Sequence, residues 1–282
     1  MAVTPRIEAH EASSVRSSGP VRAPHGRAAR LRTAVTRPYV LVNMAMSADG
    51  KTDSVERRGL RLSSEADVAR VFSLRERSDA VLVGGRTLRS EDPRLTVRGA
   101  ADARTSSPSE RYQPMKVAVV SRLDGPGTAG GLPIRSRFLA DGGAPVVVFT
   151  TGATRPRTRE WLRSQGAEVH IGAGALVDLQ EVLRNLRDRG VERLLVEGGG
   201  TLVAALVAEG LVDEVRVYVA PLLLGGAGAP TPLDGPGLPP DAAVRLRLEG
   251  VSPDPGGGVL LRYVLGAWIG PRPYDPSTGG RT

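Results

Sequence analysis

A strand, a carboxylate and a glycine turn follow one another in residues 193–202, which read Arg-Leu-Leu-Val-Glu-Gly-Gly-Gly-Thr-Leu. The residues before Glu197 have strand character, and those after Gly200 continue with helical spacing. Such a turn leaves backbone N–H groups at the positive end of the helix dipole, where a diphosphate group binds well. Glycines also allow a helix to pack closely against a sheet. This stretch alone therefore leaves ligand binding and packing as two interpretations.

Residues 79–88 repeat the arrangement, because an apolar strand runs into Gly84 and Gly85 and then into a second helical segment. Two turns of this kind in one chain favour a ligand site over packing alone. A further apolar strand, residues 39–47, ends in a turn that contains Lys51. In open α/β sheets ligands bind beyond the carboxyl ends of the strands, and these stretches place their polar residues there.

Strands and helices alternate along most of the chain, which predicts a mostly parallel sheet with right-handed crossovers. The last two strands surround a proline-glycine turn, which predicts an antiparallel hairpin at one sheet edge. The predicted fold class is α/β, with a central mixed sheet flanked by helices. The expected strands are residues 39–47, 79–83, 115–120, 144–150, 167–171, 193–196, 212–220, 243–251 and 259–265, and three of the expected helices are residues 155–165, 176–189 and 201–209.

Another helix is expected to begin after Ser63, which we assign as its N-cap. Its last turn carries Arg75 and Arg77. A cation at this place stabilises a helix through the dipole, and it can equally bind an anionic ligand, so both roles stay open. The apolar face of this helix is expected to consist of Ala66, Ala69, Val71, Phe72 and Leu74.

The composition excludes several kinds of site. The chain has 282 residues, of which 40% are hydrophobic, enough for a buried core. It has no cysteine, which excludes disulfides, thiolate nucleophiles and zinc–cysteine sites. The three histidines are scattered, so we expect no metal site. No run reaches the roughly 18 to 20 apolar residues of a membrane helix, and the N-terminus lacks the apolar block of a signal peptide, so we expect a cytoplasmic protein.

Basic residues concentrate at the N-terminus. Residues 1–38 hold seven Arg and two Glu, a balance of +5, which leaves +3 of the net charge of +8 for the rest. Residues 1–36 show no apolar period and are predicted to form a disordered basic tail. Few aromatic residues are available for stacking, so we expect no nucleic-acid binding by the folded domain, residues 37–266. Residues 267–282 are expected to form a flexible tail.

A family resemblance is carried by seven blocks in one order, which are residues 43–51, 79–87, 92–93, 95–98, 196–200, 211–214 and 220–226. Together they resemble the reductase family of riboflavin biosynthesis. The resemblance implies a dihydrofolate reductase-like fold, a homodimer, and NADPH-dependent reduction of the ribosylamino group of a pyrimidine 5′-phosphate to a ribitylamino group. Many bacterial members also carry a zinc deaminase domain, whose signature requires cysteine, so we expect a stand-alone reductase.

The resemblance implies that substrate contacts fall on Arg75, Leu95, Arg98 and Glu197. Arg75 and Arg98 are expected to clamp the 5′-phosphate, because guanidinium groups match phosphate oxygens in two-point contacts. Glu197 is expected to accept hydrogen bonds from the pyrimidine or the opened sugar. We assign Lys51 to the sugar hydroxyls and to protonation, so that Lys51 and Glu197 form the expected catalytic pair. The other interpretation of Lys51 is a surface residue after a turn.

The expected cofactor is NADPH. The sequence has no acidic residue about twenty positions beyond a G-x-G-x-x-G motif, where such a residue would bind the adenosine ribose. The preference for NADPH therefore comes from the family alone. Gly84 and Gly85 are expected to allow close approach of the backbone to the cofactor. The other cofactor-binding residues implied by the resemblance are Ala45, Thr87, Glu91, Ser121, Gly199, Gly200, Thr201 and Leu202.

Two departures from the family pattern leave the substrate open. Residues 57–63 replace the Ser-x-Trp-Ile-Thr-like run of many members, which puts Gly59 at a substrate contact and Arg61 at the place of an aromatic residue. Glu91 stands where Asp is common. One alternative is therefore a dihydrofolate reductase-like or specialised-metabolite reductase. The alternative of another class is a non-catalytic binding protein whose basic tail binds a nucleic acid or another partner.

Overall fold

The computed structural model describes residues 36–57, 59–97, 112–140 and 143–265. The expected basic tail, residues 1–36, lies outside these ranges except for its last residue, and the expected tail of residues 267–282 lies outside them entirely. Within the described ranges, no helix is long and apolar enough to cross a lipid bilayer.

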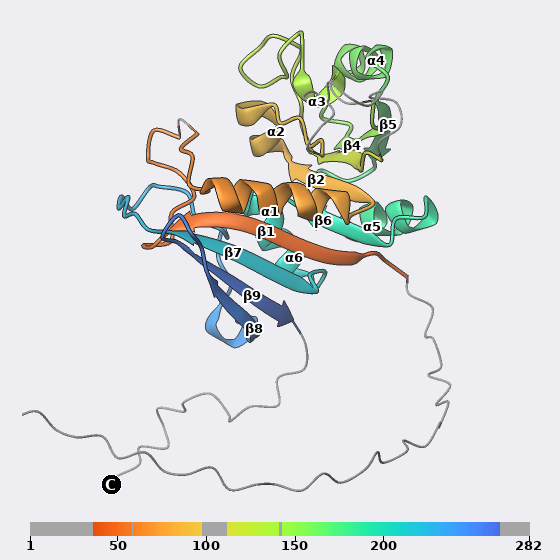
Figure 1. Cartoon of the computed structure of the whole chain (residues 1–282). Coiled ribbons are helices and arrows are strands. Elements are labelled where there is room, and N and C mark those ends of the chain that lie inside the picture. The colour runs from red at the N-terminus through yellow and green to blue at the C-terminus, as the bar shows by residue number, and fades with distance from the viewer. Residues whose placement is uncertain (1–35, 58, 98–111, 141–142, 266–282) are drawn as a thin grey trace, which may run out of the picture. The chain divides into compact units, whose positions relative to one another are not determined.

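One nine-stranded sheet runs through the described residues, in the order β5-β4-β3-β2-β6-β1-β7-β9-β8 (Figure 1). Neighbouring strands are parallel except for β7–β9 and β9–β8, which are antiparallel. The expected C-terminal hairpin at one sheet edge is thus present. The strands are β1 Tyr39–Ser47, β2 Ala80–Gly84, β3 Met115–Val119, β4 Val146–Thr151, β5 Glu168–Gly172, β6 Arg193–Val196, β7 Glu214–Ala220, β8 Leu246–Pro253 and β9 Val259–Leu265.

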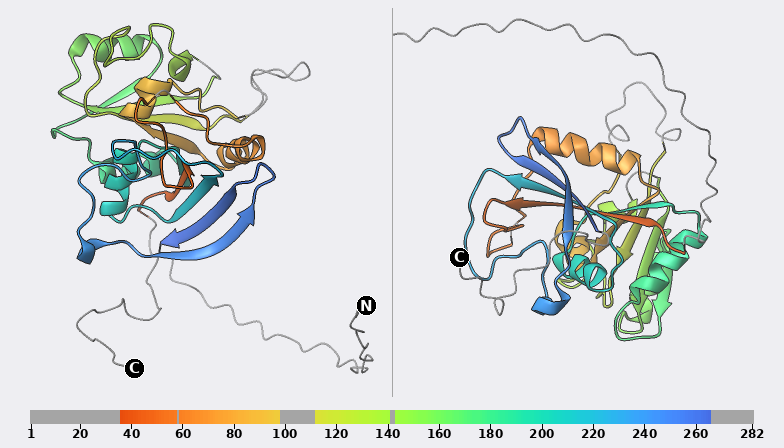
Figure 2. Two further views of the ribbon diagram at one scale, coloured as in Figure 1. Left: turned by 90° about the vertical axis from the view of Figure 1, so that its left-hand side faces the viewer. Right: turned by 90° about the horizontal axis from the view of Figure 1, so that it is seen from below.

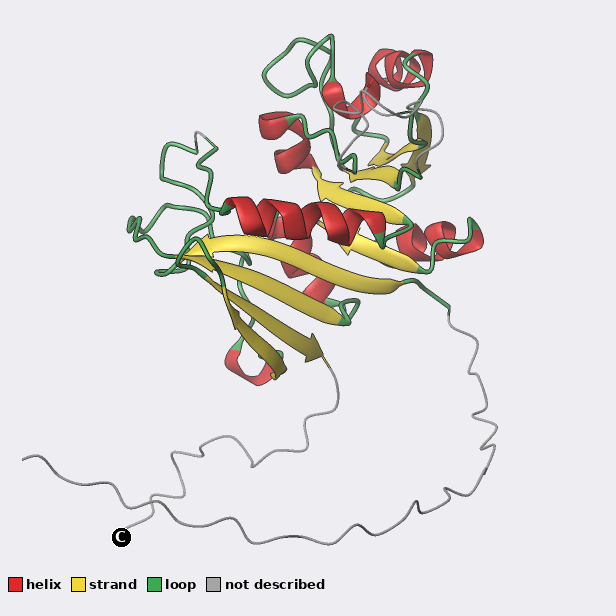
Figure 3. Cartoon of the chain, viewed as in Figure 1, coloured by secondary structure: helices red, strands yellow, loops and turns green. Residues whose placement is uncertain are grey.

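Helices cover both faces of this sheet (Figures 2 and 3). Residues of α5 and α6 belong to one core cluster, and residues of α1, α2, α3 and α4 belong to the other. The two clusters take alternate residues of the central strands, because successive side chains of a strand point to opposite faces. The helices are α1 Glu65–Glu76, α2 Gly85–Glu91, α3 Arg137–Ala140, α4 Pro156–Ser164, α5 Leu179–Asp188 and α6 Gly200–Ala208, with a short 3₁₀ helix, η2, at Pro240–Ala242.

Strand β2 shows why the central strands of the sheet have apolar residues at consecutive positions. Ala80 and Leu82 enter the cluster that contains α5 and α6, whereas Val81 and Val83 enter the cluster on the other face. All four residues are completely buried. Full burial of a Val or Leu side chain stabilises the fold by roughly 1.5–3 kcal/mol, so both faces of this strand contribute to the free energy of unfolding.

The start and the buried face of α1 differ from the prediction. Its N-cap is Ser64 and not Ser63, because Ser64 Oγ accepts a hydrogen bond from Asp67 N at 3.0 Å. The buried residues of α1 are Asp67 and Leu74, which are two turns apart, whereas the expected apolar positions Ala66 and Ala69 are exposed. Asp67 tolerates burial because its carboxylate pairs with the guanidinium group of Arg70 in the next turn of the helix.

Candidate active site

The sheet has a topological switch point between β2 and β6. From β2 the chain continues through α2 to β3, and from β6 it continues through α6 to β7, on the other side. Leu88 of α2 and Leu206 of α6 lie in core clusters on opposite faces, so the two helices leave the sheet in opposite directions. In open α/β sheets this arrangement creates a crevice at the carboxyl ends of the strands, where ligands bind.

Both glycine turns predicted from the sequence lie at this switch point and contact one another. Gly84 N donates a hydrogen bond to Gly198 O at 3.1 Å. A Cβ on Gly84 would lie 3.1 Å from Leu202 Cβ, and a Cβ on Gly199 would lie 3.4 Å from Gly84 Cα. Gly199 also has a φ of 83°, which favours glycine. Close packing of the two turns therefore accounts for several of these glycines.

The same turns leave the starts of two helices without side-chain caps. Gly84 and Gly199 are the N-cap residues of α2 and α6, and neither makes a side-chain capping hydrogen bond. A Cβ on Gly200 would lie 2.6 Å from Thr231 O, so the loop after β7 packs against the start of α6. Packing and anion binding are therefore compatible here, because glycines bring the turns together while the N–H groups that begin α6 keep no side-chain acceptor.

Arg75 and Glu197 form a largely buried two-point ion pair beside the glycine turn. Arg75 Nε lies 2.7 Å from Glu197 Oε1, and Arg75 Nη2 lies 2.6 Å from Glu197 Oε2. Arg75 Nη1 donates a third hydrogen bond to Thr96 O at 3.0 Å. The two side chains are only 15% and 11% exposed. Helix α1 thus delivers Arg75 to the end of β6, where it holds the Glu197 carboxylate in one orientation.

Two further carboxylates, Glu91 and Asp53, lie near the Arg75–Glu197 pair. Burial lowers the pKa of Arg75, but the charge and hydrogen bonds of Glu197 outweigh burial, so the pKa of Arg75 is raised. Loss of hydration raises the pKa of Glu91, and the negative charges of Glu197 and then Asp53 raise it further. Glu91 as a whole residue is exposed, so solvent screens part of this repulsion. Glu91 therefore lies close enough to Glu197 and Asp53 for their negative charges to raise its pKa.

Lys51 lies in the turn that follows β1, and Asp49 fixes this turn. Lys51 N donates a hydrogen bond to Ser47 Oγ at 2.9 Å, and Ser47 Oγ donates to Asp49 Oδ1 at 2.6 Å. Asp49 also accepts hydrogen bonds from Leu224 N at 3.0 Å and Gly225 N at 2.6 Å. These bonds tie the turn after β1 to the loop after β7, so the backbone of Lys51 has a fixed position at the sheet's carboxyl edge.

Gly59 lies in a loop that one carboxylate organises. Asp53 accepts backbone hydrogen bonds from Ser54 at 2.7 Å, Gly59 at 2.9 Å and Leu60 at 3.1 Å. Gly59 has a φ of 79°, and no atom lies within 4 Å of a Cβ placed on it. The loop is thus held from inside by Asp53, and Gly59 faces open space.

Two of the other predicted residues, Leu95 and Leu202, have buried side chains. Leu95 is 1% exposed and has a φ of 53°, and the Leu202 side chain packs against Gly84. Any contact of a ligand with these two residues would have to come through their backbone groups. Thr87 Oγ1 lies near the glycine turn, 3.6 Å from a Cβ placed on Gly199. Ala45 lies in β1, Thr201 is exposed in the first turn of α6, and Arg98 lies outside the described residues.

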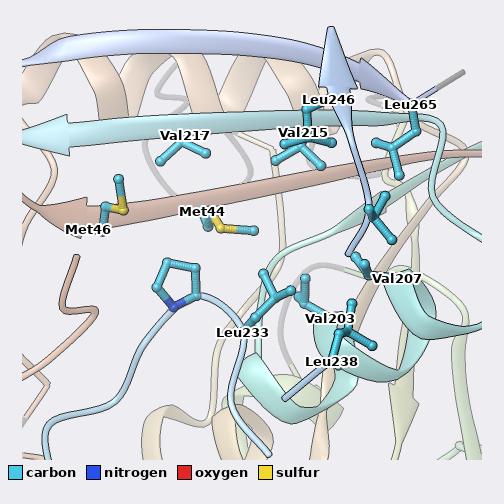
Figure 4. A pocket seen from close by; sticks show the side chains of 12 residues that line it. Met44, Met46, Val203, Val207, Val215, Val217, Leu233, Leu238, Leu246 and Leu265 are labelled. Carbon is cyan, nitrogen blue, oxygen red and sulfur yellow. The ribbon is translucent and has the colours of Figure 1, made fainter. Parts of the chain in front are cut away.

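An apolar cavity of about 220 Å³ lies between α6, the hairpin, the loop after β7 and the faces of β1 and β7 (Figure 4). Its lining residues are all apolar and include Met44, Val207, Val217, Leu246 and Leu265. It offers no side-chain charge or hydrogen-bonding group to a phosphorylated ligand. The polar crevice at the switch point is therefore the better candidate active site.

Some residues that shape the crevice had no clear signal in the sequence. Asp53 holds its loop in place by accepting three backbone hydrogen bonds. Thr96 binds Arg75 through its backbone carbonyl group, which any residue carries. Asp234 forms an ion pair with Arg86 at 3.2 Å, and it accepts a hydrogen bond from Thr231 N at 3.0 Å. An aspartate after a turn residue indicates such a role only weakly, because surface turns carry the same pattern.

The fold and the crevice define an α/β protein with a ligand site at the switch point of a mostly parallel sheet. The model of the RibD C-terminal domain family matches residues 38–260, and the chain belongs to this family. The expected dihydrofolate reductase-like fold is confirmed, with its central mixed sheet and C-terminal antiparallel strands.

Two archaeal relatives resemble the chain over most of its length. Both are called 2,5-diamino-6-ribosylamino-4(3H)-pyrimidinone 5′-phosphate reductase. The protein of Archaeoglobus fulgidus is 39% identical over 200 residues, which cover 71% of this chain and 87% of that protein. The protein of Methanothermobacter thermautotrophicus is 39% identical over 214 residues, which cover 76% of this chain and 92% of that protein.

Solved structures show the same fold. Acinetobacter baumannii RibD matches with a TM-score of 0.65 and 26% identity, over 82% of this chain and 59% of that chain. A pyrimidine reductase-like protein from Corynebacterium diphtheriae matches with a TM-score of 0.65 and 18% identity, over 81% of this chain and 92% of that chain. The second likeness concerns the fold alone.

Proposed function

We propose that this chain reduces a phosphoribosylamino-pyrimidine to the corresponding phosphoribitylamino-pyrimidine in riboflavin biosynthesis, with NADPH as reductant. The names of the two archaeal relatives support this reaction class. The structural observation that carries the proposal is the Arg75–Glu197 ion pair, held beside the uncapped start of α6 at the switch point of the sheet.

The residues at the start of α6 fit the diphosphate of a nicotinamide cofactor. Gly199 supplies no side-chain cap, and the positive end of the helix dipole favours an anion. Gly200, Thr201 and the backbone of Leu202 would hold the diphosphate, while Thr87 flanks it from α2. When bound, NADPH supplies the hydride that reduces the opened sugar. The protein then has to bind and orient the cofactor and the substrate and to exclude water from the site.

Glu197 would orient the substrate through hydrogen bonds that its carboxylate accepts. Three of the N–H groups of Arg75 are already used by Glu197 and Thr96, so we infer that Arg75 mainly positions Glu197. The phosphate clamp then falls chiefly to Arg98. Reduction of an imine takes up a hydride and a proton, and Lys51, at the end of β1, is our candidate for delivering the proton. Gly59 leaves room for the substrate in the adjoining loop.

Two measurements separate this function from its alternatives. Oxidation of NADPH is followed with the diamino and the deaminated phosphoribosylamino-pyrimidine and with dihydrofolate. We expect turnover with one of the pyrimidines and none with dihydrofolate. For the non-catalytic alternative, a fluorescence titration with NADPH decides, because an enzyme of this kind should bind the cofactor below about 0.1 mM.

We also propose that two copies pair through the apolar face around the cavity. Leu246, Leu248 and Val251 of the edge strand β8 are 40%, 51% and 55% exposed. In the sheet, Leu248 of β8 pairs with Tyr263 of β9, and Tyr263 pairs with Val215 of β7, which lines the cavity. The exposed residues of β8 therefore lie on the same face of the sheet as the cavity. Exposed apolar surface of this kind supports association.

A cytoplasmic location stays a prediction from the sequence.

A further inference from the structure

The peptide group between Thr96 and Val97 is hydrogen-bonded to a side chain at each end. Arg75 Nη1 donates to Thr96 O at 3.0 Å, and Val97 N donates to Gln113 Oε1 at 3.1 Å. The carbonyl and the N–H belong to one planar unit that does not bend easily. Gln113 is therefore linked through this unit to the guanidinium group that holds Glu197.

The short segment around this peptide group has to be held by its surroundings. Leu95 has a φ of 53°, a left-handed conformation that costs free energy for a residue other than glycine. The side chains of Leu95 and Val97 are 1% and 5% exposed, so they anchor the segment in the core. Its polar groups depend instead on Arg75 of α1 and on Gln113, which precedes β3 by two positions.

The amide of Gln113 has one possible orientation. Its oxygen must face Val97 N, because the amide nitrogen would bring two donors together. This orientation leaves Gln113 Nε2 as a buried donor with no hydrogen-bond partner among the residues that the structure describes. An unpaired buried donor lowers stability. The acceptor oxygen for Val97 is therefore what Gln113 contributes at this position.

Tyr112, the residue before Gln113, holds the helix turn that carries Arg75. Tyr112 Oη donates a hydrogen bond to Ser78 O at 3.0 Å. Ser78 lies three positions after Arg75, and its Oγ donates to Leu74 O at 2.8 Å, which ties it to the last turn of α1. Two adjacent residues thus hold both the donor and the acceptor of the Arg75–Thr96 hydrogen bond.

The two hydrogen bonds on this peptide group should strengthen each other, by about 10–30% per bond, because each polarises the group for the other. Loss of the Gln113 acceptor would weaken the bond from Arg75 to Thr96 and free one end of the guanidinium group. The Glu197 carboxylate, which is held only from that group, would then sample a wider range of orientations. A reacting geometry that is reached less often lowers the rate.

We propose that Gln113 is a positioning residue, which fixes the orientation of Glu197 through the Thr96–Val97 peptide group and Arg75. Tyr112 assists by holding the end of α1. This inference rests on the proposed function, because it takes the orientation of Glu197 to matter for turnover. Gln113 acts without contacting the substrate.

A kinetic double-variant cycle tests the proposal. Gln113→Met removes the acceptor at nearly the same side-chain length and should lower kcat about fivefold, with the dissociation constant of NADPH unchanged. In a Glu197→Gln background the same substitution should change kcat less than about twofold, because the carboxylate that it positions is already gone.

Two control variants separate positioning from general destabilisation. Gln165→Met changes an exposed glutamine at the end of α4 and should keep the wild-type kcat. Tyr39→Phe removes a hydrogen bond of 2.9 Å to Glu214 at the amino end of β1, on the opposite edge of the sheet from the crevice. It should lower the melting temperature and leave kcat unchanged.

An unchanged kcat in Gln113→Met would overturn the inference. An equal fall in the wild-type and Glu197→Gln backgrounds would overturn it as well, because an effect on structure alone is independent of Glu197. If Gln113→Met fails to fold, Tyr112→Phe takes its place in the cycle. It should lower kcat about threefold in the wild-type background only, and equal falls in both backgrounds again overturn the inference.

Failure of the proposed function would show differently, as a wild-type protein that reduces neither pyrimidine. Urea unfolding of Gln113→Met, Arg75→Gln and the double variant then decides the inference without turnover. A double variant that loses less stability than the sum of the two single variants supports the link through the peptide group, and strict additivity overturns it. Pyrimidine turnover with an additive kinetic cycle overturns this inference alone.

Discussion

Arg75 and Glu197 are 122 positions apart in the chain, yet their side chains meet in a two-point ion pair with distances of 2.7 and 2.6 Å. The pair joins α1 to the end of β6, next to the glycine turn that begins α6. It gives the crevice a carboxylate with fixed orientation. Changes to either side chain should therefore affect both turnover and stability.

Replacing Glu197 by Gln should impair turnover with little change in NADPH affinity. The amide keeps the shape of the side chain but loses the charge that faces Arg75. We expect kcat to fall at least tenfold, about 1.4 kcal/mol in activation free energy. Steady-state kinetics and an NADPH titration measure the two quantities. Wild-type turnover in the variant would remove Glu197 from the mechanism.

The ion pair should also stabilise the fold. Breaking a largely buried pair leaves one charge without its partner, so Arg75→Gln should lower the free energy of unfolding by roughly 1–3 kcal/mol. The double variant with Glu197→Gln should lose less than the sum of the two single variants, because the two side chains contact each other. Urea unfolding of the four proteins gives the coupling energy, and simple additivity would contradict the contact.

Gly200→Ala should weaken NADPH binding and lower the melting temperature. A Cβ at this position would lie 2.6 Å from Thr231 O and 3.1 Å from Asp234 N, so the loop after β7 must move away from the start of α6. Gly152→Ala is the control, because no atom lies within 4 Å of its Cβ. The comparison uses thermal unfolding and NADPH titration. Equal effects of the two substitutions would count against close packing at Gly200.

Asp49 should make the turn after β1 sensitive to acid. The Ser47 hydroxyl, followed by the backbone N–H groups of Leu224 and Gly225, lowers the pKa of Asp49 from 3.8 to about 2. A carboxyl group with a lowered pKa stabilises the fold above its unfolded pKa, and this contribution is lost as the pH falls toward the folded value.

Asp49→Asn should therefore lower the melting temperature by a few degrees at pH 7, and the difference from wild type should narrow below about pH 4. Thermal unfolding in steps from pH 7 to pH 3 follows this difference. If the difference stays constant over the whole range, the ionised carboxylate is not what fixes the turn.

A charge on the exposed row of β8 should separate the proposed dimer. Leu248→Lys places a cation on the apolar face, where a second copy would bury it without a partner. Leu176→Lys is the control, at a leucine that is 76% exposed outside this face. Light scattering after size exclusion should give a dimer for wild type and control and a monomer for Leu248→Lys. A monomeric wild type would contradict the proposal directly.

The sheet and its carboxyl edge can be predicted from the sequence, because buried parallel strands form apolar runs that end at turn residues. Strand β1 has the expected bounds, and both glycine turns lie where strands end. Helix ends are harder to predict. Ser63 and Ser64 are equal as caps in sequence, and α5 begins at Leu179 because Asp178 Oδ1 accepts a hydrogen bond from Glu181 N.

The pairing of side chains across the sheet cannot be predicted locally. The family resemblance assigns Arg75 to a phosphate, which stays a prediction, and the structure in addition pairs two of its nitrogen atoms with Glu197. The resemblance also assigns Leu95 to the substrate, and its side chain lies in the core. Strand order and backbone direction decide the Arg75–Glu197 contact and the burial of Leu95, and neither is encoded in the spacing of residues within one segment.

Reduction of a phosphoribosylamino-pyrimidine in this crevice can be tested by identifying the product. The protein is incubated with NADPH and 2,5-diamino-6-ribosylamino-4(3H)-pyrimidinone 5′-phosphate or its deaminated form, and the product is analysed by mass spectrometry. We predict a ribitylamino product formed in equal amount to the NADPH oxidised, and at least tenfold slower formation of that product by Glu197→Gln. NADPH binding with neither pyrimidine reduced would contradict the proposed function.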